Sequence, residues 1–169
     1  MTEGGCQQLF PAGRDLAVAE LERLVEGLAT RPELWRHHVR HERDRRFYVR
    51  LHRDPHVDIW LICWDAAQET GLHDHDCSSG AVRVIEGTLL EDRVAVRGRT
   101  MVLETRARRA GSSFGFDSSY IHDVRHDGGA PATSIHVYSP ALWRMGHYVL
   151  GPQGLGRVSL SYLDEVAAA

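Results

Sequence analysis

The chain has 169 residues, of which 43% are hydrophobic and 25% are charged, a composition that allows a sizeable core and excludes wholesale disorder. The formal net charge of −3 predicts no binding to nucleic acid, and the longest apolar run, residues 59–64, is too short to cross a membrane. With only three cysteines and no signal peptide at residues 1–6, we expect a single soluble domain over 1–169 that works in the cytoplasm as a monomer.

The first 45 residues are predicted to form a helical cap. Asp15 is placed to cap a helix that ends near Ala29, and four apolar residues follow at helical spacing on one face: Leu21, Leu24, Val25 and Leu28. Residues 30–33 (Thr-Arg-Pro-Glu) have the pattern of a capping box with proline near the first helical position. We therefore expect a second short helix that ends near His41.

From about residue 46 to 150 the sequence changes to short β-strand patterns punctuated by glycine and aspartate. The predicted strands are 47–52, 57–64, 81–86, 89–96, 100–104, a segment near 114–116, 120–125 and 134–138. Short helices followed by many short strands predict a mainly β fold, a small barrel or sandwich with an N-terminal helical cap.

A His-x-His pair at His73 and His75 is the first sign of a metal site. If this segment is a strand, both imidazoles point to the same face and can converge on one point. His122 is well placed to supply a third ligand. Three imidazoles suit Fe(II), Zn or Cu. The alternative for an isolated pair is two solvated histidines on an edge strand.

The surroundings of these histidines resemble the two conserved motifs of the cupin superfamily. Residues 71–87 match the first motif, with His73 and His75 ahead of a closing glycine, and residues 111–126 match the second, whose histidine is His122. The position that usually holds a metal-binding glutamate is Gly80. The resemblance therefore implies a cupin barrel with a three-histidine site.

Two further segments resemble the thiol dioxygenases, and cysteine dioxygenase above all. Residues 48–50 (Tyr-Val-Arg) are similar to the Tyr-x-Arg strand of that family, and residues 134–140 (Ser-Ile-His-Val-Tyr-Ser-Pro) to its Ser-x-His-x-Tyr-Ser-Pro signature. In the mammalian enzymes, a cysteine at the position of Gly80 is crosslinked to the signature tyrosine. The glycine here implies that Tyr138 has no crosslink.

The resemblance implies a role for each matching residue. Arg50 is expected to bind the substrate carboxylate, because its planar guanidinium can hold both oxygens, and Tyr48 is expected to shape the same pocket. Met145 is expected to close the pocket above the substrate; the alternative is a methionine that fills a gap in the core. The catalytic residues are expected to be Tyr138, His136 and Ser134. These three alternate along one strand, so they can form a hydrogen-bonded row on one face.

The implied activity is oxidation of L-cysteine to cysteine sulfinic acid by O₂, with Fe(II) on the three histidines and no other cofactor. The alternatives are dioxygenation of another small thiol (3-mercaptopropionate, cysteamine or mercaptosuccinate) and a cupin that binds a metal without catalysis. Arg50 favours cysteine, since the 3-mercaptopropionate enzymes usually carry glutamine at that position. The Ser-His-Tyr row and Arg50 favour an enzyme over a binding module.

Overall fold

The structure is a computed structural model that describes residues 13–163, most of which form β-strands. The helical elements are α1 (Val18–Ala29) and the two 3₁₀ turns η1 (Pro32–Leu34) and η2 (Arg36–His38). The strands are β1 (Phe47–Arg53), β2 (Asp58–Trp64), β3 (Ser79–Glu86), β4 (Thr88–Arg97), β5 (Thr100–Arg109), β6 (Ser113–Phe116), β7 (His122–His126), β8 (Ala132–Ser139), β9 (Arg144–Gly151) and β10 (Gly154–Tyr162).

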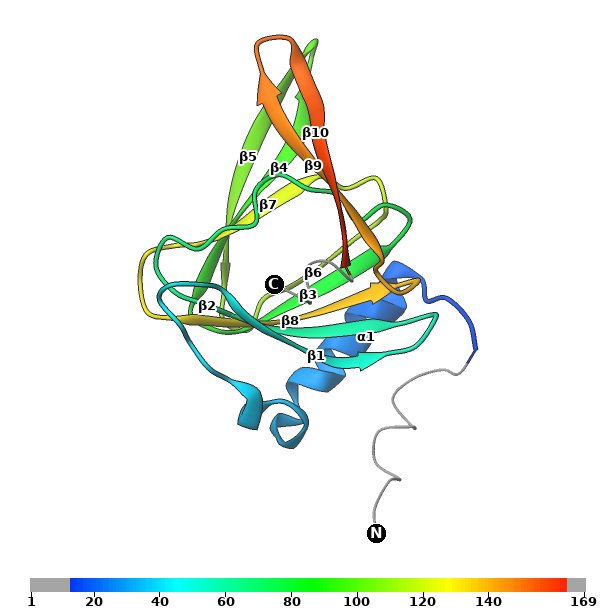
Figure 1. Cartoon of the computed structure of the whole chain (residues 1–169), viewed down its shortest axis with the longest axis vertical. Helices are drawn as coiled ribbons and strands as arrows, with labels where there is room; N and C mark the ends of the chain where they lie inside the picture. Colours follow the sequence, from blue (N-terminus) through cyan, green and yellow to red (C-terminus); the bar gives the residue numbers. More distant parts are fainter. Residues whose placement is uncertain (1–12, 164–169) are drawn as a thin grey trace.

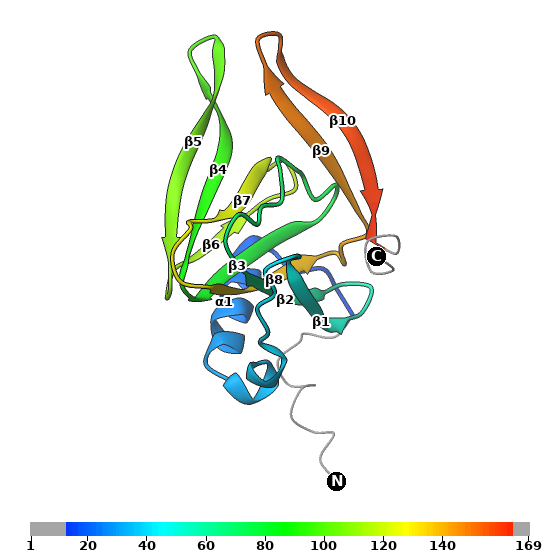
Figure 2. The same cartoon turned by 60° about the vertical axis from the view of Figure 1, so that its left-hand side comes forward.

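The strands form two walls around an interior. A five-stranded antiparallel sheet in the order β1-β2-β8-β3-β6 makes one wall. The sheet β5-β4-β7 and the hairpin β9–β10 lie across from it (Figure 1). The hairpins β4–β5 and β9–β10 extend side by side beyond the walls (Figure 2). The chain is therefore mainly β with a short helical N-terminal cap, as predicted.

Strand β2 is buried along nearly its whole length because both of its faces are covered. Its residues 59, 61 and 63 belong to the core under α1, and residues 60, 62 and 64 face the interior between the walls. The helix α1 contributes its predicted apolar face to the first of these cores: Leu21, Leu24, Val25 and Leu28. Strand alternation on the central strands thus gives one apolar face to the helix and the other face to the interior.

Two details of the helical cap differ from the prediction. The residue that caps α1 is Ala17, not Asp15, and the Glu20 carboxylate accepts a hydrogen bond from the Ala17 backbone N–H at 2.9 Å. The predicted second helix is replaced by the turns η1 and η2. Trp35, between them, has a non-helical φ of −139° and is buried, and its indole N–H donates to the Leu28 carbonyl. Burial of the Trp35 ring under α1 stabilises this non-helical backbone more than the local helix propensity stabilises a second helix.

The predicted strands are present with shifted ends, and two strands were missed. Strand β7 begins at His122 rather than at residue 120, and β5 continues to Arg109. The hairpin of β9 and β10 was not predicted, because glycines interrupt its strands and apolar side chains such as Val149 and Val158 are exposed, so the sequence shows no regular apolar alternation. None of the helices within residues 13–163 has the length and apolar character needed to span a membrane.

Candidate metal centre

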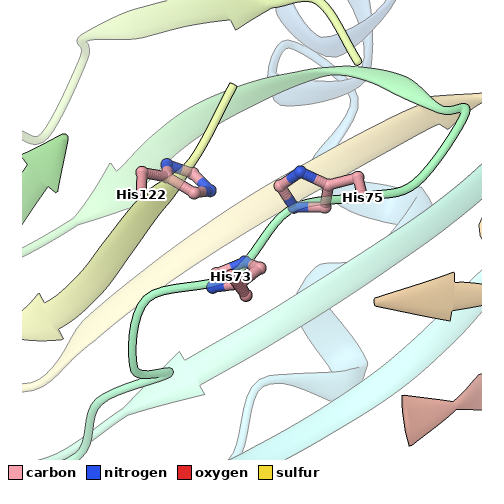
Figure 3. Close-up of side chains that lie close together, drawn as sticks. All are labelled: His73, His75 and His122. Carbon is pink, nitrogen blue, oxygen red and sulfur yellow. The ribbon is translucent and has the colours of Figure 1, made fainter. Parts of the chain in front are cut away.

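His73, His75 and His122 converge in the interior between the two walls (Figure 3). One ring nitrogen from each lies within 4.8 Å of the others, and the three residues are 5%, 1% and 2% exposed. This confirms that the predicted ligands come together. His73 and His75 do not lie on a regular strand, however, but in the segment between β2 and β3. His73 is held in place by paired backbone hydrogen bonds with His122 at 2.9 and 3.1 Å.

The ring nitrogens of these histidines fit a metal ion. His73 Nδ1 is 2.8 Å from the Gly71 carbonyl and His122 Nδ1 is 3.1 Å from Glu91 Oε1, so each ring is oriented through Nδ1 and can offer Nε2 to a metal. Both ring nitrogens of His75 are buried without a hydrogen-bond partner in the described chain. A buried polar atom without a partner is costly, and a metal ion would satisfy one of the two.

Burial also keeps these rings in the form that binds metals. It is the main reason why the pKa of His73 falls to about 3, and it lowers the pKa of His75 well below the usual value. Both rings are therefore neutral at neutral pH, with a lone pair available for coordination.

Glu91 supports the site and was missed by the sequence analysis. Its carboxylate is 1% exposed and contacts His122 Nδ1, the Tyr120 hydroxyl at 3.0 Å and Arg108 Nε at 2.7 Å. Burial alone would raise the pKa of Glu91, but the His122 hydrogen bond and Arg108 outweigh it and lower that pKa. The available signal was alternation, because Glu91 follows the buried Leu89 by two residues on β4 and must face the same interior.

Replacing Glu91 by glutamine is expected to lower metal affinity by about 10- to 100-fold, because the uncharged amide holds His122 less firmly and makes it a poorer ligand. Competition with a chelator measures the dissociation constant. Glu104→Gln is the matched control, since Glu104 pairs with Arg93 and Arg97 on the outer hairpin. Equal affinity in the Glu91 variant and the wild type would show that Glu91 does not act on the metal ligand.

The predicted row of Ser134, His136 and Tyr138 is present on β8, and all three side chains are buried. Ser134 Oγ is 2.8 Å from His136 Nε2, and His136 Nδ1 is 3.2 Å from the Tyr138 hydroxyl. The row has a further member that was not predicted. The indole N–H of Trp64, on the neighbouring strand β2, donates to Ser134 Oγ at 2.9 Å.

The order of donors along this row follows from the Trp64 N–H, which can only donate. Ser134 accepts from it, and its own buried proton is satisfied by donation to His136 Nε2. Burial lowers the pKa of His136 to about 3, so the neutral ring carries its proton on Nδ1 and donates to the Tyr138 oxygen. The Tyr138 proton is then available to a group in the interior, and burial raises the pKa of this phenol so that the proton is retained.

Gly80 leaves the space that an aromatic side chain occupies. A Cβ atom at residue 80 would lie 2.5 Å from Phe116 Cζ and 3.0 Å from Tyr138 Cδ1. The Phe116 ring stacks on the His75 imidazole with ring centroids 4.8 Å apart. The glycine therefore allows an apolar ring to pack against a predicted metal ligand, and no side chain at this position reaches Tyr138.

A cavity of about 270 Å³ opens beside the histidines. Tyr48 and Met145 line it, as the sequence predicted, together with His73, His122, His136 and Tyr138. Most of the remaining wall is apolar and includes Trp60, Ile62, Val124, Leu142 and Leu163. A cavity of this size suits a small molecule.

Arg50 is not among the residues that line the cavity, although its strand partner Trp60 is, and its expected role in binding the substrate carboxylate stays a prediction. Its Nε lies 3.4 Å from Oδ1 of the fully buried Asp58, and its guanidinium carbon lies 4.4 Å from the centre of the Trp60 ring. Asp58, on the adjacent strand β2, also pairs with Arg53. The cavity is instead lined by Arg46, which the sequence analysis did not single out.

Comparison with proteins of known structure supports the cupin fold. The chain has a TM-score of 0.51 with a cupin superfamily protein from Desulfitobacterium hafniense, at 8% identity, over 63% of this chain and 87% of that protein. It has the same TM-score with a protein from Klebsiella pneumoniae that contains a double-stranded β-helix domain, at 15% identity, over 77% of this chain and 87% of that protein.

Comparison of sequences is more specific. Cysteine dioxygenase type 1 of Homo sapiens is 27% identical over 142 residues, and that of Danio rerio is 24% identical over 147 residues. Each alignment covers 79% of this chain and 70% of the relative. The family model for cysteine dioxygenase type I matches residues 6–149, which include the three histidines and the row on β8. The chain therefore belongs to the cysteine dioxygenase type I family.

Proposed function

We propose that the protein is an Fe(II)-dependent thiol dioxygenase whose substrate is L-cysteine and whose product is cysteine sulfinic acid. Membership of a dioxygenase family supports the reaction class. The observation that carries the proposal is the cluster of three buried imidazoles, in which His75 has no partner for either ring nitrogen within residues 13–163. Three neutral ligands leave the positive charge of a divalent ion intact for an anionic thiolate.

The proposed reaction is balanced without a further reductant. A thiol and O₂ give a sulfinic acid, in which both oxygen atoms are bonded to sulfur. Sulfur loses four electrons and O₂ accepts four. Bound Fe(II) would supply the Lewis acidity that favours the thiolate and the redox chemistry that activates O₂.

The residues around the cavity have two tasks in this proposal. Tyr138 donates its proton in a hydrogen bond to substrate or oxygen in the cavity, and His136 and Ser134 hold it in that orientation. The apolar wall, which includes Ile62, Val124 and Leu142, keeps bulk water away from the reacting sulfur. Tyr48 and Met145 are placed to contact the bound thiol.

The test is O₂ consumption by the Fe(II)-loaded protein with cysteine, 3-mercaptopropionate, cysteamine and mercaptosuccinate side by side. The expected result is fastest uptake with cysteine and a product that has gained two oxygen atoms by mass spectrometry. Preference for another of these thiols would keep the reaction and change the substrate. Bound iron without uptake on any of them would overturn the proposal in favour of a cupin that binds a metal without catalysis.

A further inference from the structure

Asp74 stands between two of the predicted metal ligands, His73 and His75, and the proposed reaction gives it no task. The segment that carries these three residues is not a regular strand (Figure 3). Within it, His73 forms isolated backbone bridges to His122 and His147. Because a continuous strand ladder does not hold this segment, its alignment depends on other contacts.

The Asp74 carboxylate fastens the ligand segment to strand β9. Its Oδ1 accepts the backbone N–H of Gly146 at 2.9 Å, and its Oδ2 accepts the hydroxyl of Tyr148. The backbone N–H of Asp74 donates to the Gly146 carbonyl at 3.0 Å, and the N–H of Tyr148 donates to the Leu72 carbonyl at 2.8 Å. Asp74 is thus joined to β9 by both its backbone and its side chain, at a point between the two histidines.

Gly146 provides the space that the carboxylate occupies. A Cβ atom at residue 146 would lie 3.1 Å from both carboxylate oxygens of Asp74 and 3.1 Å from Tyr148 Cε2. The φ of Gly146 is not in the left-handed region, so backbone conformation does not call for a glycine here. The close approach of the Asp74 carboxylate to β9 is the feature that requires one.

Asp76 repeats this arrangement on the other side of His75. Its carboxylate accepts from Arg144 Nη2 at 2.6 Å and from the Trp143 indole N–H at 3.1 Å, and its backbone N–H donates to Asp74 Oδ1 at 3.1 Å. The Arg144 and Asp76 side chains are 28% and 27% exposed, so water weakens this pair. Asp74 therefore makes the more important attachment to β9.

The part of β9 that Asp74 contacts also belongs to the cavity wall. Met145 and His147, on either side of Gly146, line the cavity beside the histidines. Strands β9 and β10 form a two-stranded sheet of their own (Figure 2), so contacts such as those of Asp74 hold this hairpin against the barrel. One carboxylate thus connects the predicted metal ligands to a wall of the cavity.

We infer that Asp74 is a positioning residue of the metal centre: its carboxylate, held by Gly146 and Tyr148, fixes the His73–His75 segment against β9. The inference rests on the proposed function only for the presence of a divalent metal ion on the three histidines. Asp74 is not among the described groups that converge on that point, and it takes no part in the oxidation. Looser attachment of the segment is expected to weaken metal binding and to change the ligand geometry, because a metal site depends on the groups that orient its ligands.

Binding of Co(II) without thiol or O₂ is the first measurement. Co(II) suits imidazole sites that accept Fe(II), and its visible absorption bands report the geometry of the ligands. Asp74→Ala is expected to weaken Co(II) binding by about 10- to 100-fold, the range for groups that orient metal ligands, and to shift the absorption bands. Asp74→Asn keeps an oxygen that can accept the Gly146 N–H, so its loss of affinity is expected to be smaller.

A double-mutant cycle tests whether Asp74 acts together with Tyr148. Tyr148→Phe removes one donor to the carboxylate and leaves the backbone contacts of β9 in place. It is expected to weaken Co(II) binding by less than Asp74→Ala does and to shift the same absorption bands. Because the two side chains act through one contact, the double variant is expected to bind Co(II) no more weakly than Asp74→Ala alone.

Asp127→Ala is the matched control. Asp127 is exposed on the turn after β7, and its Oδ1 also accepts a backbone N–H, that of Gly129 at 2.8 Å. This variant should keep the Co(II) affinity and the spectrum of the wild type. The Tm of each metal-free variant, measured alongside, separates a general loss of stability from an effect on the metal centre.

The inference is overturned if Asp74→Ala keeps the wild-type Co(II) affinity and spectrum, whatever its Tm. It is also overturned if Asp74→Asn loses as much affinity as Asp74→Ala, or if the effects of the Asp74 and Tyr148 variants add. If Asp74→Ala does not fold, Asp74→Asn and Tyr148→Phe decide the question, and unchanged spectra in both would overturn the inference.

Failure of this inference is separable from failure of the proposed function. A protein that binds Co(II) in a manner dependent on Asp74, but consumes no O₂ with any thiol when loaded with Fe(II), would refute the dioxygenase proposal alone. A protein that oxidises cysteine, and whose Asp74→Ala variant binds Co(II) as the wild type does, would refute this inference alone.

Discussion

Replacement of His75 by alanine is expected to abolish stoichiometric iron binding and, with it, O₂ consumption. Among the three predicted ligands, His75 has the strongest structural support, because both of its ring nitrogens are buried without a partner in the described chain. Its ring stacks on Phe116 and also contacts the tilted ring of Tyr138, with centroid distances of 4.8 and 5.1 Å. These apolar contacts cannot replace the lost ligand. The fall in metal affinity should exceed the ~10- to 100-fold expected for Glu91→Gln.

Metal content and thermal unfolding measure this effect together. A bound metal stabilises the native state, so added Fe(II) should raise the Tm of the wild type and leave the Tm of the His75 variant unchanged. His37→Ala is the matched control, since His37 is exposed on the turn η2, and it should bind iron as the wild type does. Equal iron content in the His75 variant would remove His75 from the ligand set.

Replacement of Tyr138 by phenylalanine is expected to lower kcat by about 100-fold, a loss typical of removing one hydrogen-bond donor aimed at a reacting group. The change removes only the hydroxyl at the end of the row, and the ring keeps its packing against His75 and Phe116. Iron content should therefore stay at the wild-type level, and so should the unfolding temperature of the iron-loaded protein to within a few degrees.

Tyr162→Phe is the control for this substitution. Tyr162 is 39% exposed at the end of β10, where its ring contacts Trp143, and the loss of its hydroxyl should leave kcat unchanged. A Tyr138→Phe enzyme with undiminished kcat would show that the hydroxyl takes no part in the reaction. The row on β8 would then be a structural network that satisfies buried polar groups.

The two faces of the central strands have different roles: one packs in the core under α1, and the other carries the side chains beside the candidate metal centre. Ile135 and Val137 of β8 pack in the core under α1, while His136 and Tyr138 face the interior. Because β8 lies between β2 and β3, the row is held by hydrogen-bonded strands on both sides. A rigid support of this kind keeps a donor aimed at one point without conformational cost at the moment of reaction.

Local periodicity was enough to predict the helix α1, most strands and the facing of the β8 row. The residues of that row alternate, so any strand that contains them places them on one face. Long-range packing decided the rest of the cap. Trp35 is buried beneath α1 and breaks the second helix, and only the tertiary contact with Leu28 reveals this.

The sequence by itself was enough to pick out the three candidate metal ligands, because His73 and His75 stand at a spacing that brings two imidazoles together and His122 lies in a second recognisable segment. The tertiary structure alone decided which charges support and line the site. Glu91 reaches His122 through the pairing of β4 with β7. Arg50 pairs with Asp58 of the neighbouring strand β2, and Arg46 lines the cavity. The partners of these charged side chains lie on other strands, so residue spacing along one strand does not reveal them.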